Sequence, residues 1–361
     1  MSHSELYIGL MSGTSLDGVD VVLCSIDESS CKLLTSIEYP FDEALKDDII
    51  GAINNKATLT LQKIGEIDHR LGVLFANAIQ DLMEKNSIEP TSITAIGSHG
   101  QTLWHDPNGR YPHSMQLGDP SIISTITNIP TVADFRRKDI ALGGKGAPFA
   151  PSFHKFLFGD MGGSISIVNI GGMANISVLD ERVIGYDTGC GNVLLDIWIY
   201  KNLSQRYDRG GEWASSGKVI FPLLESMLQD EYFTLPYPKT TGRERFNEKW
   251  LSDILNNFID AKPQDIQRTL LELTAISISN EVLKFSRDIL LLCGGGAKNT
   301  LLVERLQSLM PNIQLLIAQN ADELEAMAFA WLAYKRIHLE SVELCSVTGA
   351  REDGILGGVY L

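Results

Sequence analysis

The chain lacks the features that mark nucleic-acid binding, secretion and membrane insertion. Its 361 residues include 30 Lys and Arg against 45 Asp and Glu, and this net charge of −15 argues against nucleic acid or an anionic membrane as a partner. No stretch approaches the roughly 18 apolar residues that a membrane-spanning helix needs. The five cysteines contain no CxxC pair, which indicates a reduced, non-metallic protein. The first residues lack the basic region of a secretory signal, so we expect a cytoplasmic protein.

The length and the pattern of the chain predict an α/β protein of two domains. At 44% hydrophobic residues the chain can bury a core without disulfides or structural metals. Apolar β-rich runs alternate with amphipathic helical runs, which is typical of α/β folds.

The same strand pattern occurs twice. In the first half we expect strands at 6–11, 19–26 and 32–39, with a tight polar turn at 12–18 between the first two. After a Gly/Pro-rich patch the pattern restarts at 164, as strand, glycine turn, strand and strand, about 155 residues later. The repetition predicts a duplicated α/β scaffold with a crevice between its halves.

Helical spacing of apolar residues predicts the other elements. Helices are expected at 58–85, 265–287, 301–310 and 322–338, and a helix is expected to open at 187–192 and run through 200. Buried strands are expected at 94–98 and 289–293. The stretch 210–244, which carries several glycines, aromatics and prolines, is predicted to be a long surface excursion or lid.

Two glycine turns occupy equivalent places in the two halves. The first, at 9–20, is rich in small and hydroxyl-bearing residues, whose backbone N–H groups can approach a phosphate closely. It is neither a Walker A loop nor a dinucleotide fingerprint, because it lacks GK[ST] and leads into a strand. The second turn lies at 169–175. Both could be plain hairpin turns, but two opposed hairpins could also grip a polyphosphate from both sides.

A carboxylate lies where a strand of the second half is expected to meet a helix. Asp187 stands beside Gly189 and Gly191, which leave room for a ligand. Because the helix dipole should keep Asp187 ionised, it could accept a proton as a general base. The alternative is an ordinary helix N-cap, which does not require the two glycines.

Three further clusters could contact a ligand. Gly294, Gly295 and Gly296 follow a buried strand and would let a flat purine lie on the backbone, where an ordinary turn needs one glycine. His99 fits neither a metal site nor a GxSxG hydrolase, which leaves a polar ligand shelf or a satisfied core histidine.

The last candidates are charged. A doubled arginine follows Asp134, and Arg136 could bind a substrate carboxylate or form a surface ion pair. Glu325, at the start of an apolar helix face, is either a dipole partner or a ligand to a sugar hydroxyl.

Taken together, the motifs resemble the anhydro-N-acetylmuramic acid kinase family of the sugar-kinase/Hsp70/actin superfamily. The resemblance implies duplicated actin/ribonuclease-H-like α/β domains with an interdomain cleft. We expect an N-terminal actin-like half at 1–137 and a C-terminal half with the adenosine site at 138–361, closing around a hinge near 136–146. The motifs are GLMSGTSLDGVD at 9–20, GSHGQTLWH at 97–105, VADFRRKDIALGGKGAP at 132–148, NIGGMANIS at 169–177, YDTGCGN at 186–192, LLCGGGAKN at 291–299 and EAMAFAWLA at 325–333.

The resemblance implies an ATP-dependent kinase that hydrolyses the 1,6-anhydro bond of its amino-sugar substrate and phosphorylates O6. The product would be N-acetylmuramic acid 6-phosphate, in peptidoglycan recycling. Asp187 matches the catalytic aspartate, and four residues fall in sugar-binding segments: His99, Asp134, Arg136 and Glu325. The residues implied to bind ATP are Gly13, Thr14, Ser15, Leu16, Asp17, Gly18, Val19, Asp20, Asn169, Gly171, Gly172, Asn175, Gly294, Gly295, Gly296 and Asn299.

Some expectations stay open at the level of sequence. Met11 replaces the aspartate that opens the first loop elsewhere in the superfamily, so Mg²⁺ could be placed through Asp17, Asp20 or Asp187. Related kinases often dimerise, so a homodimer is allowed. Two other functions compete: a nucleotide-gated interaction protein of the actin/Hsp70 type, and a kinase for another sugar.

Overall fold

The computed structural model describes residues 4–13, 16, 18–54 and 58–361, which form two compact units. The first unit contains the described residues up to Leu157 together with Glu323–Leu361, and the second contains Phe158–Asp322. This division differs from the expected halves, 1–137 and 138–361. The chain leaves the first unit later than expected, and its C-terminal segment returns to that unit.

The sheet of the first unit begins with an antiparallel meander. β1 pairs with β2 and β2 with β3, after which β4 adds in parallel on the other side of β1, followed by β7 in parallel and β13 antiparallel. The sheet order is therefore β13-β7-β4-β1-β2-β3. The strands are β1 (Glu5–Ser12), β2 (Gly18–Ile26), β3 (Cys31–Pro40), β4 (Ile93–Ser98), β7 (Thr131–Ala133) and β13 (Gly358–Tyr360).

Successive residues of β1 serve opposite faces of this sheet. Ile8 and Leu10 are buried with residues of α1 (Glu43–Asn54) and α2 (Leu61–Asn86) in one core cluster. Gly9, between them, faces α12 (Leu324–Ile337). This alternation follows from the two-residue period of a strand.

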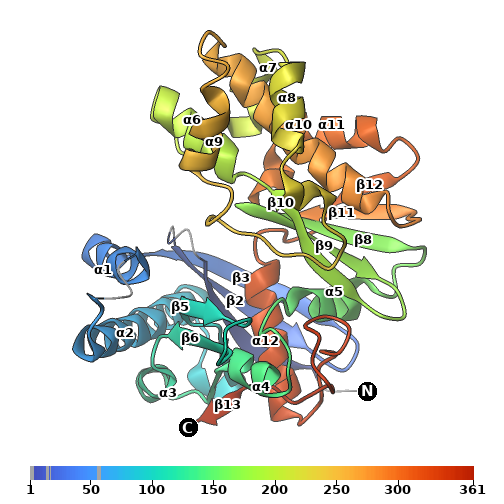
Figure 1. The fold of residues 1–361 in the computed structure, drawn as a ribbon. Helices are drawn as coiled ribbons and strands as arrows, with labels where there is room; N and C mark the ends of the chain where they lie inside the picture. The colour runs from blue at the N-terminus through green and yellow to red at the C-terminus, as the bar shows by residue number, and fades with distance from the viewer. Residues whose placement is uncertain (1–3, 14–15, 17, 55–57) are drawn as a thin grey trace. The chain divides into compact units, whose positions relative to one another are not determined.

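Helix α12 packs on its sheet at backbone distance. A Cβ added to Gly9 would lie 2.0 Å from the carbonyl oxygen of Ala326, and one added to Gly97 would lie 1.9 Å from that of Phe329. Figure 1 shows α12, in red, against the blue strands of its unit. The small residues of β1, β4 and α12 therefore allow the close approach that the apolar helix face requires.

The sheet of the second unit repeats the topology of the first. β8, β9 and β10 form an antiparallel meander, and β11 and β12 add in parallel beyond β8, which gives the order β10-β9-β8-β11-β12. The first unit shows the same arrangement in β3-β2-β1-β4-β7, so the predicted duplication of an α/β scaffold is confirmed. The strands are β8 (Ile165–Ile170), β9 (Met173–Leu179), β10 (Ile184–Cys190), β11 (Ile289–Cys293) and β12 (Gln314–Ile317).

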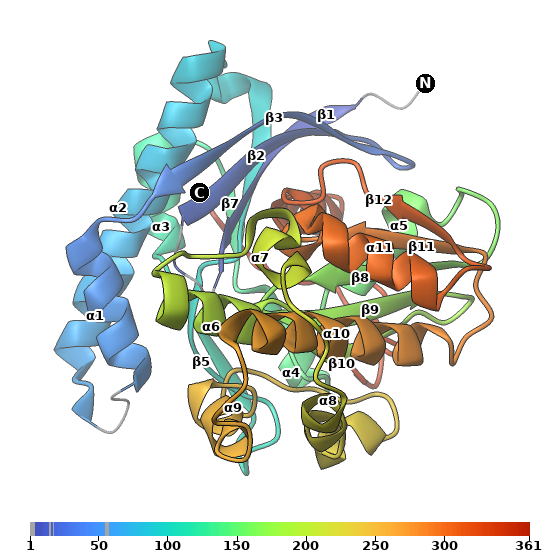
Figure 2. The same ribbon diagram turned by 90° about the horizontal axis from the view of Figure 1, so that it is seen from above.

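The helices of the second unit surround α10 (Pro263–Val282), which Figure 2 shows along β9 and β10. Most residues of α10 are buried, which explains why its sequence shows little amphipathic pattern. The other helices here are α6 (Val193–Leu203), η3 (Arg209–Gly211), α7 (Glu212–Ser215), α8 (Phe221–Leu228), η4 (Glu231–Thr234), α9 (Glu248–Leu255), η5 (Gly295–Lys298) and α11 (Thr300–Leu309).

The prediction of a surface excursion or lid at 210–244 is wrong. The segment folds into η3, α7, α8 and η4, and Leu223, Met227 and Tyr232 are fully or almost fully buried in the core of the second unit. The glycines and prolines there separate short helices, so the composition of a loop concealed a packed segment.

The first unit carries a few more elements. They are η2 (Pro90–Ser92), β5 (Gln101–Asp106), β6 (His113–Leu117), α3 (Pro120–Thr127), α4 (Phe135–Ala141) and α5 (Ala150–Phe158).

None of the helices in the described part of the chain combines the length and apolar character that a membrane crossing requires.

Candidate functional site

Asp187 lies within β10, the edge strand of the second sheet, and not at the start of a helix. Helix α6 begins only at Val193, so the prediction that 187–192 opens a helix is wrong. The pairing of β10 with β9 shifts register between Asp187 and Gly189. A bulge of this kind bends a strand locally and redirects its side chains, and bulges are common beside active sites.

The side chain of Asp187 is held at one oxygen. The hydroxyl of Thr240 donates to Oδ2 at 2.9 Å, and the backbone N–H of Thr241 donates to the same atom at 3.0 Å. Among the described residues, Oδ1 receives no hydrogen bond. One oxygen therefore fixes the orientation of the carboxylate, and the other can meet a ligand.

Burial raises the pKa of Asp187 above its ordinary value, and the hydrogen bonds from Thr241 and Thr240 lower it in part. The negative charge of Glu244 adds to the increase. The predicted helix dipole does not act on Asp187, because no helix begins at this residue, and burial is the largest cause of the shift in its pKa. A carboxylate with a raised pKa is a stronger base, which favours proton abstraction.

Three of the predicted motifs converge in the second unit. The N–H of Gly191 donates to the carbonyl of Gly172 at 2.9 Å, and that of Asn192 donates to the carbonyl of Gly171 at 2.8 Å. A Cβ on Gly191 would lie 2.3 Å from the Gly171 oxygen, and one on Gly296 would lie 2.3 Å from Ile170. Glycine is required at both positions, and the motifs at 169–175, 185–192 and 291–299 form one contiguous structure.

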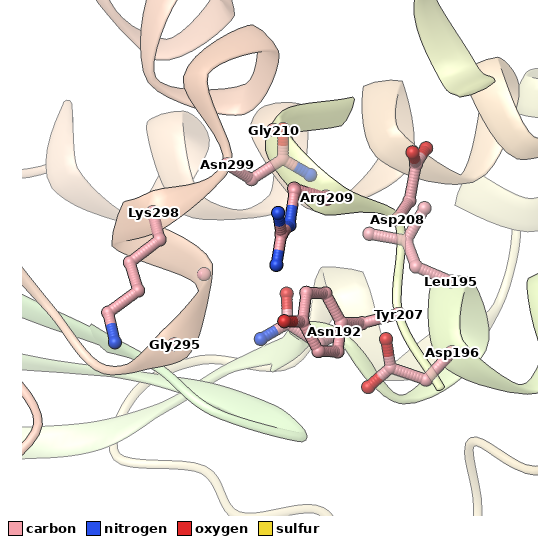
Figure 3. A pocket seen from close by; sticks show the side chains of 11 residues that line it. Asn192, Leu195, Asp196, Tyr207, Asp208, Arg209, Gly210, Gly295, Lys298 and Asn299 are labelled. Atoms are coloured by element: carbon pink, nitrogen blue, oxygen red, sulfur yellow. The ribbon is translucent and has the colours of Figure 1, made fainter. Parts of the chain in front are cut away.

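A pocket of about 440 Å³ opens beside these motifs. Gly295, Gly296 and Asn299 line it, as expected for a nucleotide site, although the Oδ1 atom of Asn299 also caps α11 by accepting from Leu302 N–H at 3.1 Å. Figure 3 shows Arg209 pointing into the space between Lys298 on one side and the Tyr207 ring on the other. The lining residues are Asn192, Leu195, Asp196, Tyr207, Asp208, Arg209, Gly210, Gly295, Gly296, Lys298 and Asn299.

Sequence reasoning missed the segment 207–210 of this pocket. It carries no phosphate or base-binding motif, and its shape depends on a local turn. The carboxylate of Asp208 accepts from the backbone N–H groups of Trp213 and Ala214, both at 2.9 Å, which folds the segment onto the start of α7. The only signal for this turn in the sequence was Asp208, which stands two residues before the glycine pair at 210–211.

The first glycine turn is described only in part, since Thr14, Ser15 and Asp17 lie outside the described residues. Leu16 and Val19 are buried in the core of the first unit, and Gly13 accepts a backbone hydrogen bond from Leu16. The role of this turn, including Gly18 and Asp20, in phosphate binding stays a prediction, as does that of Asn169 and Asn175 in the second unit.

The buried His99 and the partly exposed Arg136 form a polar pair in the first unit. Nη2 of Arg136 lies 2.7 Å from Nε2 of His99. Arginine can only donate, so Nε2 is the acceptor and the imidazole is neutral with its proton on Nδ1. Burial and the arginine charge hold the pKa of His99 well below its ordinary value, and burial lowers the pKa of Arg136 to about 10. Both pKa values agree with a neutral imidazole on His99 beside a charged guanidinium on Arg136.

This polar pair retains unused donors. Within the described part of the chain, Nδ1 of His99, Nε of Arg136 and the hydroxyl of Ser98 are buried without a hydrogen-bond partner. Buried polar atoms are rarely left unpaired, so these atoms indicate a bound ligand or ordered water. The neighbouring hydroxyl of Ser12 donates to Gln101 at 2.5 Å.

The other two predicted sugar contacts differ in their surroundings. Glu325 is exposed in the first turn of α12, and its charge favours the charged form of Arg136, so these two groups are neighbours. Oδ2 of Asp134 lies 3.5 Å from Nη1 of Arg137. Asp134 also lines a second pocket, together with Lys138 and Arg336. The interactions in the structure connect His99 with Arg136 and Arg136 with Glu325, whereas those given for Asp134 are with other residues.

No group of three or more His, Cys, Asp or Glu side chains in the described ranges could hold a metal ion. The acidic candidates Asp20 and Asp187 therefore belong to no such group, and Asp17 lies outside the described residues. A cation here would take its remaining ligands from a substrate or from water.

Comparison with known proteins identifies a family. Residues 5–361 match the model of the anhydro-N-acetylmuramic acid kinases. A protein of Sulfurovum sp. (strain NBC37-1), named anhydro-N-acetylmuramic acid kinase, is 64% identical over 360 residues, which cover 99% of this chain and 100% of the relative. A protein of the same name from Sulfurimonas denitrificans is 50% identical, covering 99% of this chain and 100% of that relative.

One solved structure supports the fold. Component A of (R)-2-hydroxyglutaryl-CoA dehydratase from Acidaminococcus fermentans superposes with a TM-score of 0.50 at 10% identity, covering 92% of this chain and 99% of that one. At this identity the likeness concerns only the fold.

Proposed function

The chain belongs to the anhydro-N-acetylmuramic acid kinase family and is a kinase, and from this premise we propose that it opens 1,6-anhydro-N-acetylmuramic acid with water and phosphorylates O6 with ATP. The product of this reaction is N-acetylmuramic acid 6-phosphate. Such a product suits the recycling of cell-wall sugars in the cytoplasm.

The observation that carries the proposal is the geometry of Asp187. Its Oδ2 atom is fixed by Thr240 and Thr241, which leaves Oδ1 for a water molecule. That water attacks the anomeric carbon and loses a proton to Asp187 while the bond from this carbon to O6 breaks. O6 then attacks the γ-phosphorus of ATP, and ADP leaves. One positioned base contributes roughly 10²–10⁴-fold to the rate of such a step.

The pocket beside the three glycine motifs supports a nucleotide site. Its backbone at Gly295 and Gly296 carries no side chains that would block a flat base. Arg209 points into the pocket, while Lys298 on its wall pairs with Asp322. We assign the adenosine end of ATP to this pocket and the phosphates to the turn at 169–175.

Mg²⁺ fits this donor set as a companion of ATP. Magnesium is usually bound through one or two carboxylates together with substrate phosphates and water, and it does not need a protein cage. Asp20 and Asp187 are alternative candidates for such a carboxylate among the described residues, and each would hold the ion together with the phosphates and water. When bound, the ion would neutralise charge on the phosphates.

The first unit supplies the groups proposed to recognise the sugar. The lactyl carboxylate of the substrate needs a cation, and Arg136 has an unused Nε donor. The neutral His99 can donate from Nδ1 to a sugar oxygen, and Glu325 can accept from a hydroxyl.

A coupled assay of ADP release tests the proposed reaction. The purified chain is given ATP, Mg²⁺ and 1,6-anhydro-N-acetylmuramic acid, and separately glucose, N-acetylglucosamine and N-acetylmuramic acid. Of these sugars, we expect only the anhydro sugar to cause rapid ADP release, and its product to be heavier than the substrate by one phosphoryl group and one water. Equal turnover of an ordinary hexose would indicate a kinase for another sugar, and ATP hydrolysis indifferent to sugars would indicate a nucleotide-gated interaction protein.

Arg136→Ala is expected to raise KM for the anhydro sugar by about 10–100-fold, with a smaller effect on kcat. The range corresponds to the loss of one charge-assisted hydrogen bond to a carboxylate. Initial rates at varied sugar concentration measure both parameters. Arg137→Ala serves as the control, since Arg137 is exposed and pairs with Asp134 at 3.5 Å. An unchanged KM in Arg136→Ala would remove Arg136 from the sugar site.

A further inference from the structure

We propose that the buried ion pair between Lys239 and Glu281 is a positioning device that fixes the catalytic carboxylate of Asp187 through the segment at 239–241. The inference rests on the proposed role of Asp187 as base. It assigns a role to two buried charged residues that the proposed reaction leaves unused.

The pair is deeply buried in the second unit. Nζ of Lys239 lies 2.6 Å from Oε1 of Glu281, and both side chains are only 3% exposed. The same ammonium donates to the carbonyl of Tyr232 at 3.2 Å and lies 4.7 Å from the centre of the Tyr232 ring. Burying two charges is costly even when they are paired, so an ion pair in a core is weak evidence for a role in stability.

The pair is connected directly to Asp187. The carbonyl of Lys239 accepts a hydrogen bond from the N–H of Asp187 at 3.0 Å, so the segment runs along the free edge of β10. The next two residues, Thr240 and Thr241, donate the two hydrogen bonds to Oδ2. The segment that orients the carboxylate therefore begins at the residue whose side chain is held by Glu281.

The other end of the pair is attached to a rigid element. Glu281 lies near the end of α10, and its Oε2 atom accepts from Tyr186 at 3.0 Å and pairs with Lys284 at 2.5 Å. Tyr186 is the residue before Asp187 in β10. Helix α10 thus holds both segments that meet at Asp187. It holds β10 through Tyr186 and the 239–241 segment through Lys239.

Lys239→Met tests the device with a side chain of similar length and no charge. Glu281 keeps Tyr186 and Lys284, so no isolated charge is left in the core. We expect kcat to fall at least about tenfold while KM for ATP and for the sugar stay within about twofold, because a small displacement of a reacting group lowers turnover without affecting binding. Rates are measured well below the melting temperature of each variant.

Lys284→Met is the matched control, since it removes the other ammonium from the same carboxylate without touching the 239–241 segment. It should lower stability as much as Lys239→Met or less, and leave kcat within about twofold. If Lys239→Met does not fold, Glu281→Gln, which keeps an acceptor for Tyr186, is expected to give the same loss of kcat. An unchanged kcat in Lys239→Met, or an equal loss in Lys284→Met, overturns the proposal.

A double-mutant cycle separates this inference from the proposed function. If Lys239 acts through Asp187, adding Lys239→Met to Asp187→Asn lowers kcat no further, whereas a general loss of structure would lower it again. Retained turnover in Asp187→Asn alone refutes the base assignment. A loss in Asp187→Asn combined with additive effects in the cycle refutes only the positioning role.

Discussion

Asp187→Asn is expected to reduce kcat by at least about 10²–10⁴-fold, the contribution of one positioned general base. The amide oxygen of asparagine can still accept from Thr240 and Thr241, so the side chain keeps its place and loses only its basicity. We expect ATP affinity to change little, since the predicted adenosine contacts at 294–296 are untouched. Single-turnover rates and equilibrium titration with a non-hydrolysable nucleotide measure the two quantities.

Stability provides the control for this variant. Burial raises the pKa of Asp187 in the folded chain, so folding is favoured while the group is protonated and is penalised as the pH rises through that raised pKa. At neutral pH the ionised carboxylate costs stability, and Asp187→Asn should melt at the same temperature as the parent or higher. A lower melting temperature together with lost activity would instead indicate a structural role. Asp253→Asn, at an exposed position, should change neither activity nor stability.

Gly97→Ala is expected to destabilise the first unit by about 3 kcal/mol or more, at the upper end of the cost of overpacking. The new methyl group would lie 1.9 Å from the carbonyl oxygen of Phe329 and 3.1 Å from the Cβ of Ala333. Neither the β4 backbone nor the α12 backbone can give way as a flexible side chain does, so the helix must move off the sheet. Chemical denaturation followed by far-ultraviolet circular dichroism measures the loss.

Gly65→Ala provides the opposite expectation in the same unit. Gly65 lies on the exposed side of α2, where an added Cβ meets nothing within 4 Å. Alanine is favoured over glycine in a helix interior, so this variant should gain about 0.5–1 kcal/mol. Similar stabilities for the two alanine variants would show that α12 does not contact β4 as closely as described.

The duplicated scaffold could be predicted because its signals are local. The apolar run at 6–11, the glycine turns and the buried strand at 289–293 depend on neighbouring residues, and the structure places these strands within a residue or two of the expected ranges. The return of α12 to the first unit could not be read from its own sequence. An apolar helix face indicates burial, but not which sheet it covers. The predicted crevice between the halves stays a prediction.

The electrostatics of Asp187 were predicted wrongly for a similar reason. Its local sequence predicts a helix start whose dipole would lower the pKa of Asp187, whereas no helix begins there and burial raises that pKa. The residues that hydrogen-bond its carboxylate, Thr240 and Thr241, are more than fifty positions away. The surroundings of His99 were likewise left open between a ligand shelf and a core histidine. The structure combines the two, because the ring is buried yet its Nδ1 atom has no partner among the described residues.

The placement of α12 also affects how the chain is made. The glycine-bearing strands β1 and β4 leave the ribosome early, while the helix that covers them follows the whole second unit in the sequence. At about 5–20 residues per second, the nascent strands wait roughly ten seconds or longer for that helix. The second unit can fold in the meantime. The first unit, most of which is synthesised first, therefore completes its fold last.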